Sequence, residues 1–427
     1  MRERVRVIAG ILLWVGVLLC FIVAGFSVLF NREDDTTPHA SEQKVAEEYI
    51  ERATPESVGL DGDHLRHIAA RVEECIDNGT FTGSVVAIVR GDKLAYIEAF
   101  GTREQGGEAM STDTRFDLAS LTKPIATAVA VMQLVESGKL RLNQRVSDII
   151  PEFKEYRDTK TKELIPTTIG DLMTHTSGLR PYVALSRLEE DYADREALDQ
   201  SVMIDYIANS ERLGAPRSIC KYSCLNYILL GVIVERCSGM SLDEYTQKHI
   251  YEPLNMRNTR FKPDAEYAQR TAPTSPAGAE EELRGVVNDP LAREVMAGVS
   301  GNAGLFSTAE DLAIYAAMIL NGGEWRGAKV LTPTAVEMLF AKPTKIECQR
   351  TLAWEELLPE VESEALSPAV YNHNGATGTS ISIDRERDMA IIILTNRTHA
   401  EGKAKDLMAL RSSIRAIATY AIIGDAE

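Results

Sequence analysis

Apolar residues recur with helix-like or strand-like spacing along most of the chain. Over 61–78 they follow the period of an amphipathic helix. The runs 84–90 and 93–100 are rich in residues that favour strands, and Gly91-Asp92 between them is typical of a hairpin turn. The apolar run 124–135 predicts a buried helix. The first third of the chain is therefore predicted to contain two helices and a β-hairpin.

The middle of the chain, over 168–340, is mostly helical in pattern, with loops between the helices. Helices are predicted over 171–179, which ends on a glycine, and over 222–239 and 311–320. Residues 262–300 are rich in Pro, Gly, Ala and Glu and predict a long ordered loop. A loop of this length inside a domain commonly carries function.

Strand patterns return near the C-terminus. Residues 378–384 and 389–395 flank a charged turn and predict a second hairpin, and 404–423 follow the pattern of an amphipathic helix. Strands near both ends, with helices between them, predict one antiparallel sheet built from N- and C-terminal strands, flanked by helices and carrying a large helical insert. The predicted fold class is α+β.

The N-terminal segment has a different pattern, because residues 7–30 carry no charge and only small or apolar side chains. These 24 residues are long enough to cross a bilayer with some tilt. Three arginines precede the segment and an acidic cluster follows at 33–35, which places the N-terminus in the cytoplasm. We therefore predict a cytoplasmic tail (1–6), a transmembrane signal anchor (7–30), a polar linker (31–54) and an exported domain (55–427).

A cleaved signal peptide is the alternative interpretation of this segment. The apolar core of a signal peptide is usually shorter than this segment. The only small residues that fit a cleavage site here are Val23-Ala24-Gly25. A lipoprotein signal is disfavoured, because Leu18-Leu19-Cys20 lacks the small residue expected before the cysteine. No second apolar span of comparable length occurs. The predicted location is the cell membrane, single-pass, with the folded domain on the extracytoplasmic side, periplasmic or at the cell surface.

Charge and cysteine usage narrow the classes of partner and site. The chain has 46 basic and 63 acidic residues and a net charge of −17, so no nucleic acid partner is expected. Six cysteines are present, with no C-x-x-C pair and no Cys/His cluster at metal-binding spacing. An exported domain can hold disulfides, but the five cysteines outside the anchor leave one unpaired. The sequence alone assigns no bridge, and a disulfide of Cys224 with Cys220 or Cys237 is one alternative that it leaves open.

One stretch, 116–124, carries candidate chemistry. Ser120 and Lys123 stand three apart at the start of the predicted apolar helix, where residues at i and i+3 share a face. A neighbouring amine can take the proton of a hydroxyl, and a helix N-terminus offers unpaired backbone N–H groups to the oxyanion. The stretch therefore predicts covalent acyl transfer.

The S-x-x-K pattern has low specificity by itself, since it occurs three times in the chain. The pair at 41–44 lies in the polar linker, and the pair at 218–221 lacks a clear helix start. The alternative interpretation of Ser120 and Lys123 is a capping serine followed by a surface lysine. Their position before a buried helix favours the catalytic interpretation.

Two downstream stretches add to this site. In 221–231, Tyr222 begins an apolar helix beside a lysine, whose charge favours a phenolate and so suits proton transfer. In 371–379, the run His373-Asn374-Gly375-Ala376 precedes a strand, and glycine there lets a substrate backbone approach a sheet edge. A half-buried structural tyrosine and a structural histidine are the alternatives. The chain contains no G-x-S-x-G, H-E-x-x-H or P-loop motif.

In this order and spacing, the three stretches resemble one family, the penicillin-recognising serine hydrolases. Within it they are similar to the branch of class C β-lactamases, D-alanyl-D-alanine carboxypeptidases and related esterases. The resemblance covers about residues 55–420 and extends to 171–179, 298–307 and 391–397. It implies a β-lactamase/transpeptidase-like fold and a reaction without metal or cofactor.

The resemblance also implies a role for each matching position. Ser120 would be the acylated nucleophile, Lys123 its proton partner and Tyr222 the general acid/base. His373-Asn374-Gly375 would form the third motif, on the strand that lines the cleft. The backbone N–H groups of Ser120 and Ala376 would form the oxyanion hole, worth about 3 kcal/mol per donor in comparable sites.

The chain departs from the family pattern at several positions. The second motif usually reads Y-x-N, but Cys224 here replaces the carboxamide that would bind a substrate amide and fix Lys123. His373 stands where many β-lactamases carry lysine, a variant that esterase and peptidase relatives often share. Asn288 and Asn302 stand where similar sequences often show histidine. We expect hydrolytic activity to survive, because the nucleophile, the amine and the phenol remain. We do not expect β-lactams to be hydrolysed at the rate of a true β-lactamase.

The leading hypothesis is a membrane-anchored serine hydrolase that acts through an acyl-enzyme on a small peptide, amide or ester, in particular a D-alanyl-D-alanine peptide of the cell wall. The alternative within the enzyme class is an esterase for small acyl esters, which needs no amide-binding carboxamide. A third hypothesis is a catalytically silent binder of cell-wall peptides. Substrate choice is expected to lie in the loops 180–217, 262–297 and 343–370.

Overall fold

The computed structural model describes residues 50–275, 282–342, 346–358, 367, 369–400 and 404–424. They belong to one compact unit that spans 49–427. The predicted anchor at 7–30 lies outside the described residues. Within them, no single helix is long and apolar enough to cross a membrane, and Cys224–Ser238 with Leu242–Tyr251 passes that test only as a pair bent by 75°.

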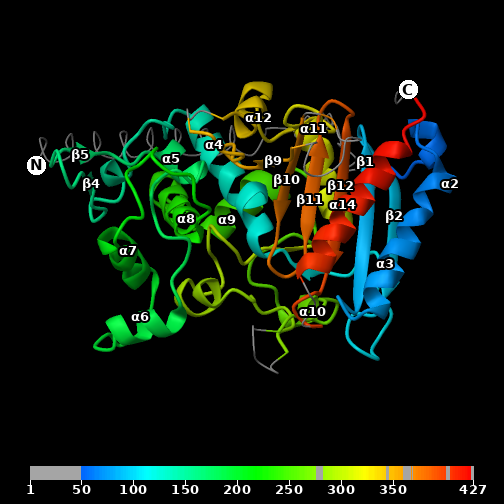
Figure 1. Cartoon of the computed structure of the whole chain (residues 1–427), viewed down its shortest axis with the longest axis horizontal. Helices are drawn as coiled ribbons and strands as arrows, with labels where there is room; N and C mark the ends of the chain where they lie inside the picture. Colours follow the sequence, from blue (N-terminus) through cyan, green and yellow to red (C-terminus); the bar gives the residue numbers. More distant parts are fainter. Residues whose placement is uncertain are drawn as a thin grey trace, which may run out of the picture. The chain divides into compact units, whose positions relative to one another are not determined.

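Within the described residues, a six-stranded antiparallel sheet joins the two ends of the unit in the order β2-β1-β12-β11-β10-β9 (Figure 1). The N-terminal β1 pairs with the C-terminal β12, from Ser84 opposite Thr395 to Arg90 opposite Met389. The predicted α+β fold, with a sheet built from both termini, is confirmed. The strands are β1 Gly83–Arg90, β2 Lys93–Gly101, β9 Glu355–Glu356, β10 Val370–Asn374, β11 Ser380–Asp384 and β12 Met389–Thr395.

Most helices lie in the insert between β2 and β9. The α-helices are α2 Gly62–Leu65, α3 His67–Asp77, α4 Ala128–Glu136, α5 Ile169–Met173, α6 Leu185–Asp191, α7 Gln200–Asn209, α8 Cys224–Ser238, α9 Leu242–Thr246, α10 Ala265–Ala268, α11 Ala309–Leu320, α12 Pro333–Leu339 and α14 Ala404–Tyr420. Short 3-10 or π-helical segments are η1 Pro55–Val58, η2 Ala119–Leu121, η3 Lys123–Thr127, η4 Val146–Asp148, η5 Gln247–Tyr251 and η6 Leu291–Val295. Short antiparallel pairs are β3 Phe116–Asp117 with β6 Phe306–Ser307, β4 Tyr156–Arg157 with β5 Leu164–Ile165, and β7 Glu324–Trp325 with β8 Ala328–Lys329.

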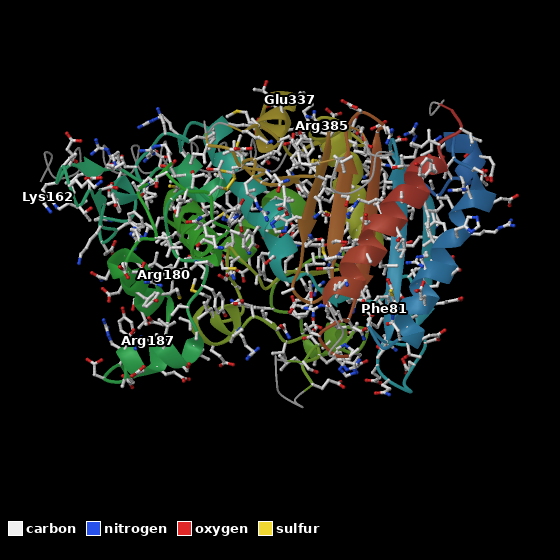
Figure 2. The ribbon with its side chains drawn as sticks, viewed as in Figure 1. Phe81, Lys162, Arg180, Arg187, Glu337 and Arg385 are labelled. Atoms are coloured by element: carbon white, nitrogen blue, oxygen red, sulfur yellow. A yellow bond between two sulfur atoms is a disulfide. The ribbon has the colours of Figure 1, made fainter. Side chains whose placement is uncertain are left out.

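Alternate side chains of the central strands face two hydrophobic cores. Val86 and Ile88 of β1 belong to the core beneath α3 and α14, together with Phe81 (Figure 2). Val85 and Ala87 face the other side and belong to the larger core that includes α4, α8 and α11. Successive side chains of a strand point to opposite faces, so one strand serves both layers. Figure 1 shows α3 and α14 side by side over the sheet.

The predicted hairpins and the helices near 222–239, 311–320 and 404–423 are confirmed within a few residues. The helix predicted over 61–78 is present but divided into α2 and α3. The turn of the second hairpin is held against α12 by an ion pair of Arg385 with Glu337 (Figure 2). Where the structure describes it, the region 262–300 contains two short helical segments, α10 and η6, in an otherwise irregular path.

The helix predicted over 171–179 ends earlier than its glycine. Its helical residues, α5, stop at Met173, and His175 adopts a left-handed φ of 59°. The N–H groups of His175 and Thr176 donate to the carbonyls of Leu172 and Asp171, which closes the helix end in a Schellman-like turn. Histidine is among the side chains that tolerate this conformation, so it takes the place expected for glycine.

Candidate active site

The serine of the first motif lies on a constrained turn before α4. Sequence periodicity predicts one continuous helix here, but the chain passes through a 3-10 turn, η2, and a π-helical segment, η3, before α4 begins. Ala119, next to Ser120, has a φ of 46°, a costly conformation for a residue with a side chain. The buried Asp117 carboxylate accepts the Ala119 N–H at 2.8 Å and thereby holds this turn.

The Lys123 side chain connects this turn to Asn302 and to the start of α8. It is fully buried, and its Nζ donates to Ser120 Oγ at 3.0 Å and to the Asn302 carbonyl at 2.9 Å. Its Nζ also lies 3.6 Å from Cys224 Sγ. Burial lowers the pKa of Lys123, but the nearby Cys224 and Tyr222 raise it, and the result lies above the usual value. Lys123 is therefore an ammonium at neutral pH, beside the serine hydroxyl.

Tyr222 lies just before α8 and faces the same ammonium. Its ring centroid is 5.0 Å from Lys123 Nζ, and Ser223 caps the helix by accepting the Asn226 N–H. The Tyr222 hydroxyl oxygen is buried, and the Tyr222 side chain interacts directly with Lys123. A phenol in this position is free to exchange a proton with a substrate.

Two imidazoles flank the phenol. The ring centroids of His175 and His373 lie 4.6 and 6.1 Å from that of Tyr222. Burial first, and then the charges of Arg350 and Lys123, hold the pKa of each histidine well below its usual range. His175 is therefore neutral, and its Nδ1 accepts the backbone N–H of Ser223 at 3.1 Å. The family resemblance covers His175, within 171–179, but implies no role for it.

The third motif lies at the end of β10 and contacts the serine turn. Thr377 Oγ1 donates to the Asp117 carbonyl at 2.7 Å, and Thr379 Oγ1 donates to the Leu118 carbonyl at 2.9 Å. A Cβ on Gly375 would lie 2.5 Å from that Leu118 carbonyl oxygen. Only glycine permits this approach, which brings the turn containing Ala376 against the residues that precede Ser120.

Side chains of the third motif do not all face Ser120. His373 faces Tyr222, whereas Asn374 lines a separate pocket of about 130 Å³ with Met408 and Arg415 of α14. Successive residues of a strand point to opposite faces, which explains this division. The predicted substrate-binding residues are therefore brought together only in part, because the Asn374 side chain lines the other pocket.

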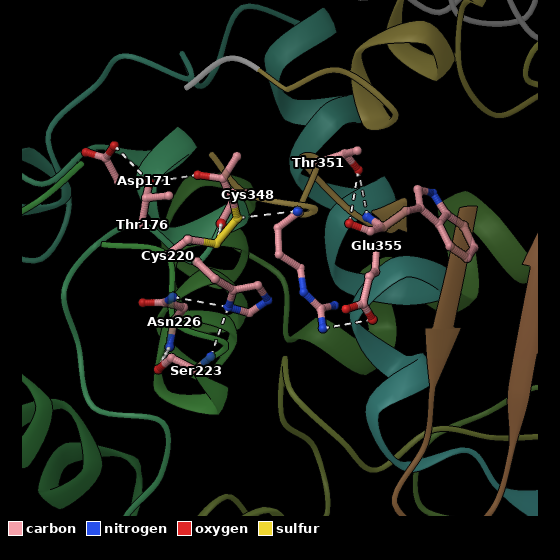
Figure 3. Close-up of a disulfide and its surroundings, with 12 residues drawn as sticks. Asp171, Thr176, Cys220, Ser223, Asn226, Cys348, Thr351 and Glu355 are labelled. Carbon is pink, nitrogen blue, oxygen red and sulfur yellow. Dashed lines mark hydrogen bonds and ion pairs between the residues drawn. A yellow bond between two sulfur atoms is a disulfide. The ribbon is translucent and has the colours of Figure 1, made fainter. Parts of the chain in front are cut away.

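Cysteine pairing differs from every pairing considered for Cys224. Cys220 is bonded to Cys348, whereas Cys224, Cys237 and Cys75 are free. The disulfide links the segment before Tyr222 to a segment near the end of the insert (Figure 3). The hypothesis that Cys224 is tied to Cys220 or Cys237 is therefore wrong, and its thiol stays beside Lys123.

Asn288 and Asn302, which stand where similar sequences often show histidine, contact the site residues through their backbones, while their side chains bond to Ser275 and Ser300. The Asn288 N–H donates to Asp117 Oδ2 at 2.7 Å, and the Asn302 carbonyl accepts from Lys123. Sequence reasoning missed Arg350, whose Cζ lies 4.8 Å from the Tyr222 ring centroid; no local pattern marks it. Among the described residues, no group of three His, Cys, Asp or Glu side chains is placed to hold a metal ion.

Known proteins resemble this chain over most of its length. The family model described as Beta-lactamase matches residues 68–413. Curated relatives from Salmonella gallinarum and Salmonella agona are 30% identical over 82% of this chain and 86% of their own length. Both are named as D-alanyl-D-alanine carboxypeptidases, an assignment that the names themselves give as provisional.

Solved structures share the fold at lower identity. EstCE1, described as a hydrolase with promiscuous acyltransferase activity, has a TM-score of 0.65 and 22% identity over 85% of this chain and 99% of its own. A β-lactamase/D-alanine carboxypeptidase from Pseudomonas syringae has a TM-score of 0.64 and 20% identity over 82% and 98%. Together with the family match, these similarities show that the chain belongs to the β-lactamase family of serine hydrolases.

Proposed function

We propose that this serine hydrolase is a membrane-anchored D-alanyl-D-alanine carboxypeptidase that works through an acyl-enzyme on Ser120. The observation that carries the proposal is the 3.0 Å contact of Lys123 Nζ with Ser120 Oγ, on a constrained turn docked against β10. A buried ammonium at this distance stabilises a developing alkoxide. The names of the Salmonella relatives support the choice of peptide substrate.

The proposed reaction begins with attack of Ser120 Oγ on the carbonyl carbon of the penultimate residue. In this scheme Tyr222 starts as a phenolate beside the Lys123 ammonium and accepts the hydroxyl proton, while the Lys123 charge stabilises the developing anion on Ser120 Oγ. The backbone N–H groups of Ser120 and Ala376 would bind the oxyanion of the tetrahedral intermediate. Tyr222 then gives its proton to the leaving amine, the C–N bond breaks, and the acyl-enzyme forms. Water, deprotonated by Tyr222, releases the acid by the reverse steps.

An esterase for small acyl esters is the second candidate, and Cys224 favours it. The side chain next to Lys123 is a thiol, which is a much weaker hydrogen-bonding group than a carboxamide. An ester has no N–H for a carboxamide to bind, so the replacement of that carboxamide by a thiol costs an ester less binding free energy than it costs a peptide. The solved neighbour EstCE1, described as a hydrolase with promiscuous acyltransferase activity, has the same fold.

The test is acylation followed by turnover. The protein is incubated with a fluorescent penicillin and with a p-nitrophenyl ester, and its intact mass and adduct position are measured. We expect an adduct on Ser120 that Ser120→Ala abolishes, and Ser120-dependent release of D-alanine from a diacyl-L-lysyl-D-alanyl-D-alanine peptide. Ester turnover without D-alanine release would favour the esterase. Peptide binding without any adduct would instead favour the silent cell-wall-peptide binder.

A further inference from the structure

Two segments that are remote in sequence meet at Tyr222. The Cys220–Cys348 disulfide joins them across a sequence separation of 128 residues. Two residues beyond each cysteine stand Tyr222 and Arg350, and the Arg350 guanidinium lies over the Tyr222 ring at 4.8 Å. The disulfide (Figure 3) and this cation–π contact therefore form two successive links between the same pair of segments.

Arg350 is held from its other side as well. Its Nη2 lies 3.0 Å from Glu355 Oε2, and its backbone N–H donates to Cys348 Sγ at 3.4 Å. The following turn is closed by Thr351 Oγ1, which accepts the N–H of the fully buried Trp354 at 2.9 Å. The Arg350 side chain is only 18% exposed, so its position depends on the segment that the disulfide anchors.

The charge of Arg350 reaches the groups around Tyr222. After burial, it is the foremost cause that holds the pKa of His175 and of His373 below the usual range. Arg350 is thus a second cation at the site, and it lies on a different segment of the chain from Lys123. Opposite charges a few ångströms apart attract one another strongly in a partly buried site, so displacing Arg350 would change the energy of an anion on the Tyr222 oxygen.

We propose that the Cys220–Cys348 disulfide acts on the reaction through Arg350, a positioning residue that it holds over Tyr222. The disulfide keeps the guanidinium beside the phenol while Tyr222 carries the serine proton. Reduction by a thiol or phosphine, which adds two electrons and two protons to the S–S bond to give two thiols, frees the segment and slows turnover. This inference rests on the proposed function, because it assigns Tyr222 its proton-transfer role.

The experiment is a double-mutant cycle between reduction and Arg350→Gln. Initial rates with p-nitrophenyl acetate, an uncharged ester, give kcat and KM for wild type and variant, oxidised and after reduction with a phosphine. Mass spectrometry after alkylation confirms that residues 220 and 348 carry the new adducts. Circular dichroism establishes that every state is folded at the assay temperature.

We expect reduction to lower kcat of the wild type by about tenfold with little change in KM, and to lower that of Arg350→Gln by less than about twofold, because coupled groups are non-additive. Oxidised Arg350→Gln should match the reduced wild type, and Arg350→Lys should recover part of the loss. Arg385→Gln is the matched control, since Arg385 also pairs with a glutamate and lies over an aromatic ring, that of Phe340. It should keep wild-type activity and its full sensitivity to reduction.

Equal losses on reduction in wild type and Arg350→Gln would overturn the inference, because the disulfide would then act through general stability. An unchanged kcat in the reduced wild type would overturn it too, while leaving the proposed function intact. A Cys220→Ser/Cys348→Ser variant repeats the test without reductant, and chemical reduction of the folded wild type replaces it should it fail to fold. Absence of Ser120-dependent turnover in the oxidised wild type would reject the proposed function and this inference together.

Discussion

The thiol of Cys224 lies 3.6 Å from the Nζ of Lys123, at the first residue of α8. A carboxamide is the group that the family pattern leads one to expect there. The ammonium therefore has a weakly hydrogen-bonding neighbour at the point where a peptide substrate would need a donor and an acceptor.

We predict that Cys224→Asn raises turnover of amide or β-lactam substrates by about tenfold, since 1.4 kcal/mol corresponds to one decade in rate and a net hydrogen bond contributes about that much. Ester turnover should change little. Steady-state rates with a D-alanyl-D-alanine peptide, a β-lactam and an ester measure this, with Cys224→Ala as the control. Unchanged amide turnover together with a lower melting temperature would mean that Cys224 only packs against the helix.

Asp117→Ala should weaken both the fold and the acylation of Ser120. The buried carboxylate accepts the buried N–H of Ala119 at 2.8 Å and the part-buried N–H of Asn288 at 2.7 Å. Its removal leaves both unsatisfied, at a cost of about 1–3 kcal/mol for the buried donor. The turn with its left-handed Ala119 then loses its support. Urea unfolding and the rate of labelling by a fluorophosphonate measure the two effects. A variant that unfolds earlier but labels at the wild-type rate would contradict the positional role.

Gly375→Ala should separate β10 from the serine turn. The added methyl would lie 2.5 Å from the Leu118 carbonyl oxygen and 2.1 Å from Thr379 Oγ1, so the backbone must shift, at a cost of about 1–3 kcal/mol. We expect a lower kcat/KM for every substrate together with a lower melting temperature. Gly424→Ala provides a comparison for stability, because an added Cβ there meets nothing within 4 Å and the backbone is not left-handed. An active Gly375→Ala enzyme would show that this close approach is dispensable.

The free energy of unfolding should decrease as the pH rises from about 4 to about 7, in part because of Asp311. Burial raises the pKa of this carboxyl from 3.8 to about 7, although Thr259 and the Asn258 N–H hydrogen-bond to it. Between these values the folded state binds the extra proton, so unfolding becomes easier as the pH rises, by up to about 4 kcal/mol at 1.36 kcal/mol per pH unit.

Asp311→Asn tests this dependence, because its amide oxygen can still accept both hydrogen bonds while Oδ1, which has no partner among the described residues, becomes an NH₂ group. Unfolding free energies at pH 5 and pH 8 should differ less in the variant than in the wild type. The buried Asp117, whose pKa burial raises to about 6, contributes a slope of the same sign that should remain. An unaltered pH dependence would exclude Asp311 as its source.

The segment 7–30 is predicted to stay on the protein as a membrane anchor. Three arginines before it and acids after it argue for a cytoplasmic N-terminus. N-terminal sequencing of the membrane fraction should recover the initiating region, and a variant without residues 1–30 should leave the membrane. A soluble chain that begins near Phe26 would identify the segment as a removed signal peptide.

Local sequence patterns were enough to predict the two hairpins, the main helices and the α+β class. Each of these depends on residues within a few positions of one another, such as Gly91-Asp92 between its strands or Gly239 at the end of α8. The spacing of Ser120 and Lys123, and the family motifs that follow, identified the candidate nucleophile and its amine in the same way.

The surroundings of Tyr222 could not be derived from such patterns. Cys220 finds Cys348 128 residues away, and Arg350 reaches the phenol only because that bond and Glu355 hold its segment. The side of β10 that Asn374 faces likewise follows from the pairing of that strand. Contacts of this kind arise from packing between distant parts of the chain, where the free energy of the whole core selects the neighbours and no short stretch of sequence carries the information.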